Sequence, residues 1–217
     1  YLNATRSASE TINGNTNSGE INGTDYVGGI FGYMTLQDGS NNDTITVSNN
    51  KNSGKVTGSK NYVGGIVGYV CGKYSYISYT SYYAKVKIAE CKNNASIEGV
   101  DYVGGIVGYA PEYVSEISSC ENLDSVTGNL YVGGYAGYAS GTTMRSLENR
   151  QTITGKAYLG GIAGYAGKLE SCVNKGTIVA EGYYLDNNSN ILSLRQKVFP
   201  NTIMYFFQKK NQRVSLP

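Results

Sequence analysis

Residues 62–69 read YVGGIVGY, so three of the eight residues in this very hydrophobic stretch are glycines. Glycine weakens strands and helices alike, because it adds conformational entropy to the unfolded chain and has no side chain to pack. The stretch is nevertheless one of five copies: YVGGIFGY from Tyr26, YVGGIVGY from Tyr62 and again from Tyr102, YVGGYAGY from Tyr131 and YLGGIAGY from Tyr158. All three glycines recur in every copy, which indicates an internal repeat with a specific need for glycine.

A second segment precedes each copy and occurs once more after the last one. In NKNSGKVTG and CKNNASIEG, for example, the third residue is asparagine and a β-branched residue follows four places later. The six asparagines are Asn17, Asn52, Asn93, Asn122, Asn149 and Asn174. The β-branched residues are Ile21, Val56, Ile97, Val126, Ile153 and Ile178. The full unit is therefore x-x-N-x-x-x-I-x-G, a short gap, and Y-V-G-G-I-V-G-Y.

The repeat length and composition favour stacked β-structure. Successive motifs begin 36, 40, 29 and 27 residues apart, and the variation falls in linkers such as 34–44 and 70–85, which we expect to be loops. The units are rich in Gly, Asn, Thr, Val, Ile and Tyr, which favours strands over helices. We therefore predict an all-β protein, a parallel β-solenoid of about five to six coils stacked at about 4.8 Å.

Two explanations of the glycines follow from such a stack. A bend at Gly64-Gly65 would turn both Val63 and Ile66 inward, whereas a regular strand buried on both faces needs no bend. We expect the third glycine, Gly68 and its equivalents, to leave room for a neighbouring tyrosine ring. Stacked side chains of the six asparagines are expected to form a structural hydrogen-bonded ladder.

The unit resembles the GLUG-motif repeat of large bacterial surface and secreted proteins, over roughly residues 12–182. Some of those proteins carry an IgA-protease-type peptidase domain, and others look like adhesins. The resemblance implies a non-catalytic structural or binding module, extracellular or at the cell surface, joined to flanking domains of a longer chain. Parallel β-helices that act on polysaccharides suggest the alternative, a glycan-active lyase or hydrolase. We assign residues 1–182 to the solenoid and 183–217 to a C-terminal cap or tail, and we expect the whole to be an excised fragment.

Composition limits the chemistry. The 217 residues include no histidine, so His-based catalytic triads and His-based zinc sites are excluded, and the sequence predicts no cofactor or metal. The formal net charge is +2 with no basic stripe along the repeats, which argues against nucleic acid. No stretch of 18 apolar residues occurs, so we expect no membrane insertion.

Three of the four cysteines, Cys91, Cys120 and Cys172, occupy the same repeat position, and Cys71 lies in a linker. Adjacent coils bring equivalent Cα atoms within disulfide range, so a Cys91–Cys120 bridge is conceivable. Leu147 in the same column favours the alternative, a stack of buried free thiols.

Carboxylates give weak signals. Asp25 and Asp101 share a column that Asn61 interrupts, and Glu116, Glu121 and Asp124 are close in sequence. Neither set differs from ordinary surface charge. The turn DGSNND at 38–43 is rich in calcium-type ligands but lacks the spacing of an EF-hand loop, so we expect a solvated loop.

Ten of the 21 tyrosines form two columns at the ends of the motif. An odd separation of seven residues places the two columns on opposite faces of an unbroken strand, one packed inside and one outside. The second column is our candidate binding surface for a host glycan or matrix protein, although a purely structural aromatic ladder is the other interpretation. It consists of Tyr33, Tyr69, Tyr109, Tyr138 and Tyr165.

Overall fold

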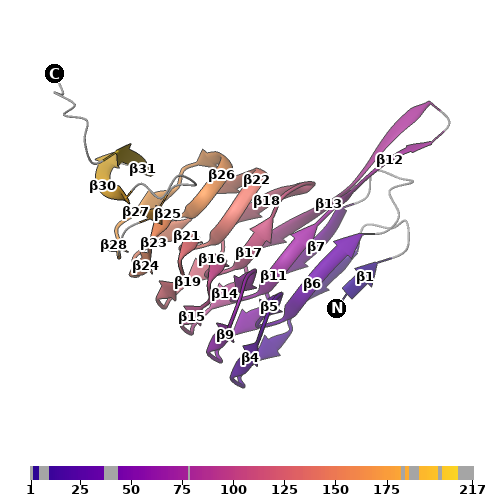
Figure 1. Cartoon of the computed structure of the whole chain (residues 1–217). Coiled ribbons are helices and arrows are strands. Elements are labelled where there is room, and N and C mark those ends of the chain that lie inside the picture. Colours follow the sequence, from indigo (N-terminus) through magenta and orange to yellow (C-terminus); the bar gives the residue numbers. More distant parts are fainter. Residues whose placement is uncertain are drawn as a thin grey trace.

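The computed structural model describes residues 2–4, 10–36, 44–77, 79–181, 184–185, 191–199 and 202–209. Within these ranges the protein is built from strands without a helix, and successive repeats form the coils of a parallel β-solenoid (Figure 1). The predicted fold class is therefore confirmed. Six strands in these ranges carry the repeat asparagine, which agrees with the predicted five to six coils.

Each coil contributes strands to five ladders. Three of these ladders contain the repeat asparagine, the β-branched residue and the first half of the YVGGIVGY motif. The asparagine ladder contains β3 (Thr16–Asn17), β8 (Lys51–Asn52), β14 (Lys92–Asn93), β19 (Glu121–Asn122), β23 (Glu148–Asn149) and β27 (Val173–Asn174). The β-branched ladder contains β4 (Ile21–Gly23), β9 (Val56–Gly58), β15 (Ile97–Glu98), β20 (Val126–Thr127), β24 (Ile153–Gly155) and β28 (Ile178–Ala180). The valine–glycine ladder contains β5 (Val27–Gly28), β10 (Val63–Gly64), β16 (Asp101–Gly104), β21 (Leu130–Gly133) and β25 (Ala157–Gly160).

The other two ladders complete the coil. The glycine–tyrosine ladder contains β1 (Leu2–Ala4), β6 (Phe31–Leu36), β11 (Val67–Cys71), β17 (Val107–Ala110) and the first parts of β22 (Ala136–Arg145) and β26 (Ala163–Glu170). The closing ladder contains β2 (Thr11–Asn13), β7 (Thr44–Ser48), β13 (Thr80–Ala89), β18 (Val114–Ser118) and the later parts of β22 and β26. Register between coils is parallel and places like over like: Val63 lies between Val27 and Val103.

Corners of the coil are made by residues in the left-handed region, and most of them are not glycines. The first tyrosine of all five motifs has a positive φ, from 53° at Tyr158 to 64° at Tyr62. A second left-handed corner lies before the asparagine ladder, at Asn49, Glu90, Ser119, Ser146 and Ser171. Among the described glycines, only Gly14 has a left-handed φ. The motif glycines are therefore required for space and not for conformational freedom.

Two separate hydrophobic cores run along the solenoid. The smaller core packs the β-branched ladder against the valine–glycine ladder, as Val56 and Ile97 pack near Val63 and Val103. The larger core lies between the glycine–tyrosine and closing ladders and includes Ile66, Val70 and Ile88. The chain bends at Gly65-Ile66, between β10 and β11, so the bend is present but lies one residue later than the predicted Gly64-Gly65. Val63 and Ile66 both point inward, but each enters a different core.

The glycines form the narrow waist between these cores. A Cβ on Gly64 would lie 2.8 Å from the backbone nitrogen of Gly108, and one on Gly65 would lie 2.6 Å from Cγ of Asn93. Our expectation for the third glycine is wrong, because a Cβ on Gly68 would meet backbone, including the carbonyl oxygen of Gly32 at 2.6 Å. It makes room for the adjoining coil and not for a tyrosine ring.

Two segments leave the coil. The linker 70–85, expected to be a loop, instead pairs β12 (Lys73–Ile77) with the start of β13 as an antiparallel hairpin, the insertion arm, which projects from the solenoid (Figure 1). At the C-terminal end, β29 (Tyr184–Leu185), β30 (Ile191–Phe199) and β31 (Thr202–Lys209) form an antiparallel sheet, and β31 lies close to β25. The tail thus leaves the parallel pattern, and its role as a cap stays a prediction.

Candidate binding surface

The two tyrosine columns lie on the same outer face. The rings of Tyr26 and Tyr33 meet edge to face at 5.3 Å between centroids, and those of Tyr102 and Tyr109 do so at 4.8 Å. The prediction of opposite faces is therefore wrong. It assumed an unbroken strand, whereas the left-handed tyrosine and the bend at the second glycine reset the alternation of side chains.

Rings within each column stack along the solenoid axis. Centroids are 4.3–5.2 Å apart in the first column, with interplanar angles of 3–17°. They are 4.8–5.5 Å apart in the second, with angles of 9–26°. Each internal ring therefore turns its faces toward its neighbours, and ring edges form most of the outer boundary. The end residues Tyr26, Tyr158 and Tyr165 are 43%, 37% and 47% exposed, and the internal rings are half-buried.

This packing changes the acidity of the phenols. Burial, followed by the nearby Cys71 thiol and the neighbouring rings, raises the pKa of Tyr69 to about 12. Burial and the adjacent Tyr158 ring raise the pKa of Tyr131 to about 12. Tyr69 and Tyr131 thus stay neutral well above the pH at which free tyrosine ionises, so their phenols can donate and accept hydrogen bonds.

The asparagine column forms the predicted ladder. Nδ2 of Asn52 donates to Oδ1 of Asn93, and Nδ2 of Asn93 donates to Oδ1 of Asn122, each at 2.8 Å. The same bond joins Asn17 to Asn52 and Asn149 to Asn174, so the ladder has two parts, Asn17 to Asn122 on β3, β8, β14 and β19, and Asn149 to Asn174 on the separate pair β23 and β27. Each of the six amides also donates to the carbonyl two residues ahead, which fixes the turn before the next strand. These residues are structural, because the four inner amides are almost completely buried.

The cysteines are free, and three of them are buried as predicted. Cys91, Cys120 and Cys172 follow Asn50 in one column that faces the larger core. A hydrogen bond from the Cys120 thiol lowers the pKa of Cys91, and the same bond together with burial raises the pKa of Cys120. Cys71 differs, since it is only half-buried and lies at the outer end of β11.

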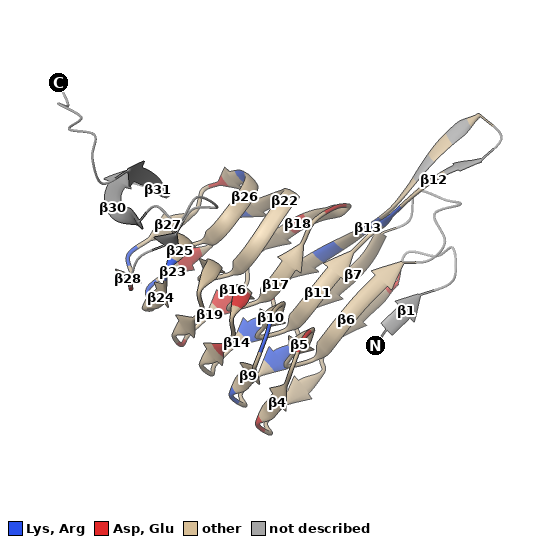
Figure 2. Ribbon diagram, viewed as in Figure 1, with Lys and Arg blue, Asp and Glu red and all other residues tan. Residues whose placement is uncertain are grey.

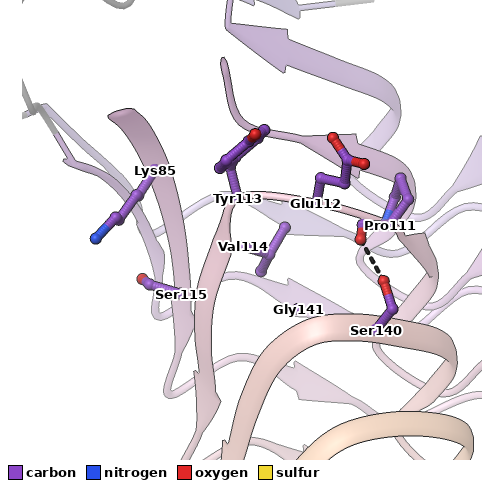
Figure 3. Close-up of a pocket in the computed structure, with 8 residues that line it drawn as sticks. All are labelled: Lys85, Pro111, Glu112, Tyr113, Val114, Ser115, Ser140 and Gly141. Atoms are coloured by element: carbon purple, nitrogen blue, oxygen red, sulfur yellow. Dashed lines mark hydrogen bonds between the residues drawn. The ribbon is translucent and has the colours of Figure 1, made fainter. Parts of the chain in front are cut away.

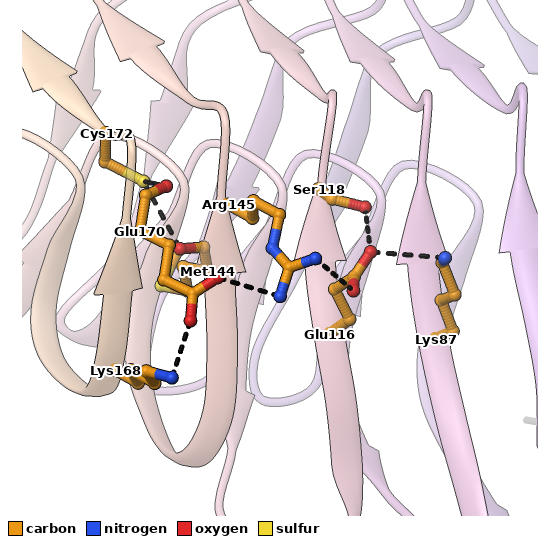
Figure 4. Close-up of polar contacts among 8 residues, drawn as sticks. All are labelled: Lys87, Glu116, Ser118, Met144, Arg145, Lys168, Glu170 and Cys172. Atoms are coloured by element: carbon orange, nitrogen blue, oxygen red, sulfur yellow. Dashed lines mark hydrogen bonds and ion pairs between the residues drawn. The ribbon is translucent and has the colours of Figure 1, made fainter.

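The candidate carboxylates join adjacent coils. Oδ1 of Asp25 accepts the backbone N–H of Asn61, and Oδ1 of Asp101 accepts that of Leu130. Glu121 pairs with Lys92, and Glu116 lies between Lys87 and Arg145 (Figure 4). Charges of both signs are interspersed along the coils (Figure 2). Oδ1 of Asp124 accepts the N–H of its neighbour Ser125. These candidate carboxylates are therefore engaged separately and do not form a shared catalytic cluster.

Within the described ranges, no three His, Cys, Asp or Glu side chains are placed to hold a metal ion together. No helix of that part of the chain has the length and apolar character needed to cross a membrane. The turn at 38–43 lies outside the described residues.

A tyrosine cluster at the base of the insertion arm was missed by sequence analysis. The rings of Tyr74, Tyr83 and Tyr113 lie 5.3–6.4 Å apart, and Tyr113 comes from the turn between β17 and β18. The many tyrosines and serines in 74–83 are the signal that was available in the sequence, but the contact with Tyr113 depends on the stacking of coils.

Comparison with family models, with curated proteins and with solved structures found no match for this chain.

Proposed function

We propose that this chain is a non-catalytic structural and binding repeat module of a bacterial cell-surface or secreted protein. Its partner in this proposal is a host glycan or a matrix protein. The observation that carries the proposal is the double tyrosine column, a rigid aromatic surface that continues over five coils. Large, regular aromatic surfaces of this kind are typical of interaction sites. In such a module the solenoid is a spacer, adhesin-like in character, that displays this surface and joins flanking domains.

The carboxylates support the non-catalytic alternative over a glycan-active enzyme. An inverting or retaining glycosidase needs two carboxyl groups that face one substrate. Asp25 and Asp101 are instead engaged by backbone N–H groups of the next coil, and Glu116 is engaged by Ser118 and Lys87.

Binding by the second column is tested with two triple variants of Tyr69, Tyr109 and Tyr138. The Phe variant keeps the stacked rings and removes the hydroxyls, whereas the Ser variant removes both. We expect the Phe variant to keep the melting temperature of the wild type and to lose binding to a glycan array or to immobilised matrix protein. The Ser variant should also melt earlier, because each cross-strand ring pair contributes roughly 0.2–1 kcal/mol.

Unchanged binding by both triple variants would reject the column as the adhesive surface. Release of reducing sugar or of unsaturated uronate from polysaccharides by the wild-type protein would instead favour the enzyme.

A further inference from the structure

We propose that the cleft between the insertion arm and the turn 111–113 binds a neutral oligosaccharide. The proposal goes beyond the function proposed above, because it assigns a ligand class to a second site that shares only Tyr33 with the tyrosine columns. Four observations carry it: the shape of the cleft, its partly exposed aromatic rings, its charge balance and its size.

The turn Pro111–Tyr113 separates two adjoining hollows. The larger, of about 720 Å³, lies toward the arm. It is lined by Tyr33, Thr35, Leu36, Cys71, Gly72, Lys73, Tyr74, Glu112 and Tyr113. The second, of about 610 Å³, continues past Tyr113 toward Lys85, Ser115 and Ser140, and Figure 3 shows Tyr113, Glu112 and Pro111 following one another along its border. Glu112 and Tyr113 line both hollows, so an extended chain can pass over this turn.

The turn itself is held in place from both sides. The Ser140 hydroxyl, on β22 of the next coil, donates to the carbonyl of Pro111 (Figure 3). Tyr113 has a left-handed φ of 54°, which costs free energy in a non-glycine residue. On the other side, the backbone N–H of Gly72 donates to the carbonyl of Glu112. A turn whose backbone is bonded to both neighbouring coils is ordered before any ligand arrives, which lowers the entropic cost of binding.

Aromatic rings are more widely spaced here than in the columns. Tyr74 and Tyr113 are nearly parallel, with an angle of 18°, but their centroids are 6.4 Å apart. In the columns the corresponding spacing is 4.3–5.5 Å, so neighbouring rings cover one another. Tyr83 contacts both rings at 5.3 and 6.0 Å with a tilt of 44°, yet Tyr74 and Tyr83 stay 40% and 38% exposed, so part of each ring is left to a ligand. The C–H face of a pyranose packs on such a face, while its hydroxyls bond to polar groups around it.

The charge of the larger hollow is balanced. Lys73 contributes the one cation and Glu112 the one anion, and neither has an ion-pair partner in the described part of the chain. Elsewhere on the solenoid, lysines such as Lys87 and Lys92 are paired with glutamates of the next coil. An unpaired ammonium, an unpaired carboxylate and several hydroxyls suit a ligand with many hydroxyl groups and no net charge.

The size and shape favour a short sugar chain over a folded protein. Pockets for small ligands enclose roughly 300–1,000 Å³, and both hollows fall in this range. A stable protein partner needs a broader surface, of roughly 800 Å² on each side. A concave, two-part cleft beside a projecting hairpin therefore fits an oligosaccharide of a few residues.

Direct binding tests the proposal. The full chain is titrated calorimetrically with cellohexaose, mannohexaose and chitohexaose as neutral probes and with hexagalacturonate as an anionic probe. We expect at least one neutral probe to bind, and Tyr113→Ala and Tyr74→Ala each to weaken it at least about tenfold. Tyr79→Ala is the matched control, because Tyr79 lies at the tip of the same arm, is 94% exposed and is outside the cleft. It should leave affinity unchanged.

A second measurement does not depend on how the variants fold. Cys71 lines the larger hollow and is half-buried, so a bound neutral hexasaccharide should slow its alkylation in the wild-type protein. Alkylation at Cys71 is followed by mass spectrometry. Binding without protection of Cys71, with no effect of Tyr74→Ala or Tyr113→Ala, would place the sugar elsewhere and overturn the proposal.

The remaining outcomes separate this proposal from the proposed function. No binding by any neutral probe, preference for hexagalacturonate, or arm-dependent binding of collagen alone would each overturn the oligosaccharide site. If the cleft variants bind normally while the Phe variant of Tyr69, Tyr109 and Tyr138 loses binding, the column function stands and the cleft proposal fails. Loss in the cleft variants alone supports the cleft and rejects the column.

Discussion

At the scale of single residues, the second glycine of the motif is a tightly constrained position. A Cβ on Gly65 would meet both Asn93 and the carbonyl oxygen of Gly105, and neither can move without breaking the ladder. We expect Gly65→Ala to lower the free energy of unfolding by about 3 kcal/mol or more. Gly19→Ala is the control, since its Cβ would have 3.8 Å to the nearest atom, and it should cost less than about 0.5 kcal/mol. Equal effects in urea unfolding would show that the waist tolerates a methyl group.

The thiols also report on single positions. Cys91, Cys120 and Cys172 are buried, so we expect them to react slowly with a thiol reagent in the native protein and fully after unfolding. Cys71 should react faster than these three, although burial raises its pKa and so slows it relative to a free thiol. Labelling followed by peptide mass spectrometry assigns each rate. Rapid native labelling of the three column cysteines would contradict their placement in the larger core.

At the scale of elements, the asparagine ladder is expected to stabilise the stack cooperatively. Asn93 accepts from Asn52 and donates to Asn122, so Asn93→Ala removes one hydrogen bond from the buried Nδ2 of Asn52 and one from the buried Oδ1 of Asn122. We expect a loss of about 1–3 kcal/mol, and a smaller one for Asn17→Ala, which disturbs one neighbour only. Asn94→Ala is the matched control, because the adjacent side chain is not part of the ladder. Similar losses at all three positions would reduce the column to a turn preference.

The tyrosine columns predict a dependence of stability on alkaline pH. Folded pKa values near 12 for Tyr69 and Tyr131 lie above the value near 10 of an unfolded tyrosine. The corresponding stability is fully present below pH 10 and is lost as the pH rises through about 12. Absorbance at 295 nm should therefore show that Tyr69 and Tyr131 ionise only near pH 12 in the native protein, whereas in denaturant they should ionise near pH 10. A single native transition near pH 10 would contradict the packed columns.

At the scale of the whole molecule, a solenoid needs both of its ends covered. The strand β31 lies close to β25, the last strand of the valine–glycine ladder, and we predict that residues 183–217 act as the cap. A chain that stops at Glu181 should melt at a lower temperature and self-associate with increasing concentration, because open strand edges pair with other chains. Light scattering and thermal unfolding check both effects. A truncated chain that stays monomeric and equally stable would show the tail to be dispensable.

The repeat pattern was enough to predict the parallel solenoid, the bend, the asparagine ladder and the buried thiols. Each depends on a residue type that recurs at the same position of every repeat. Because the coils stack, residues at the same repeat position lie directly above one another. The glycine pair was explained from the sequence by a bend, whereas the structure showed that only a residue without a side chain fits between the asparagine column and the adjoining coil.

Only the tertiary structure decided where the tyrosines lie and what surrounds them. Side-chain direction depends on φ at Tyr62 and its equivalents, and a left-handed corner at a tyrosine cannot be read from composition. The hairpin at 73–84 and its contact with Tyr113 likewise arise because an insertion in one coil reaches the turn of the next. The positions of repeated residues follow from the periodicity of the sequence. The cleft is formed by residues of an insertion and a turn that do not repeat, so their neighbours are set by tertiary packing alone.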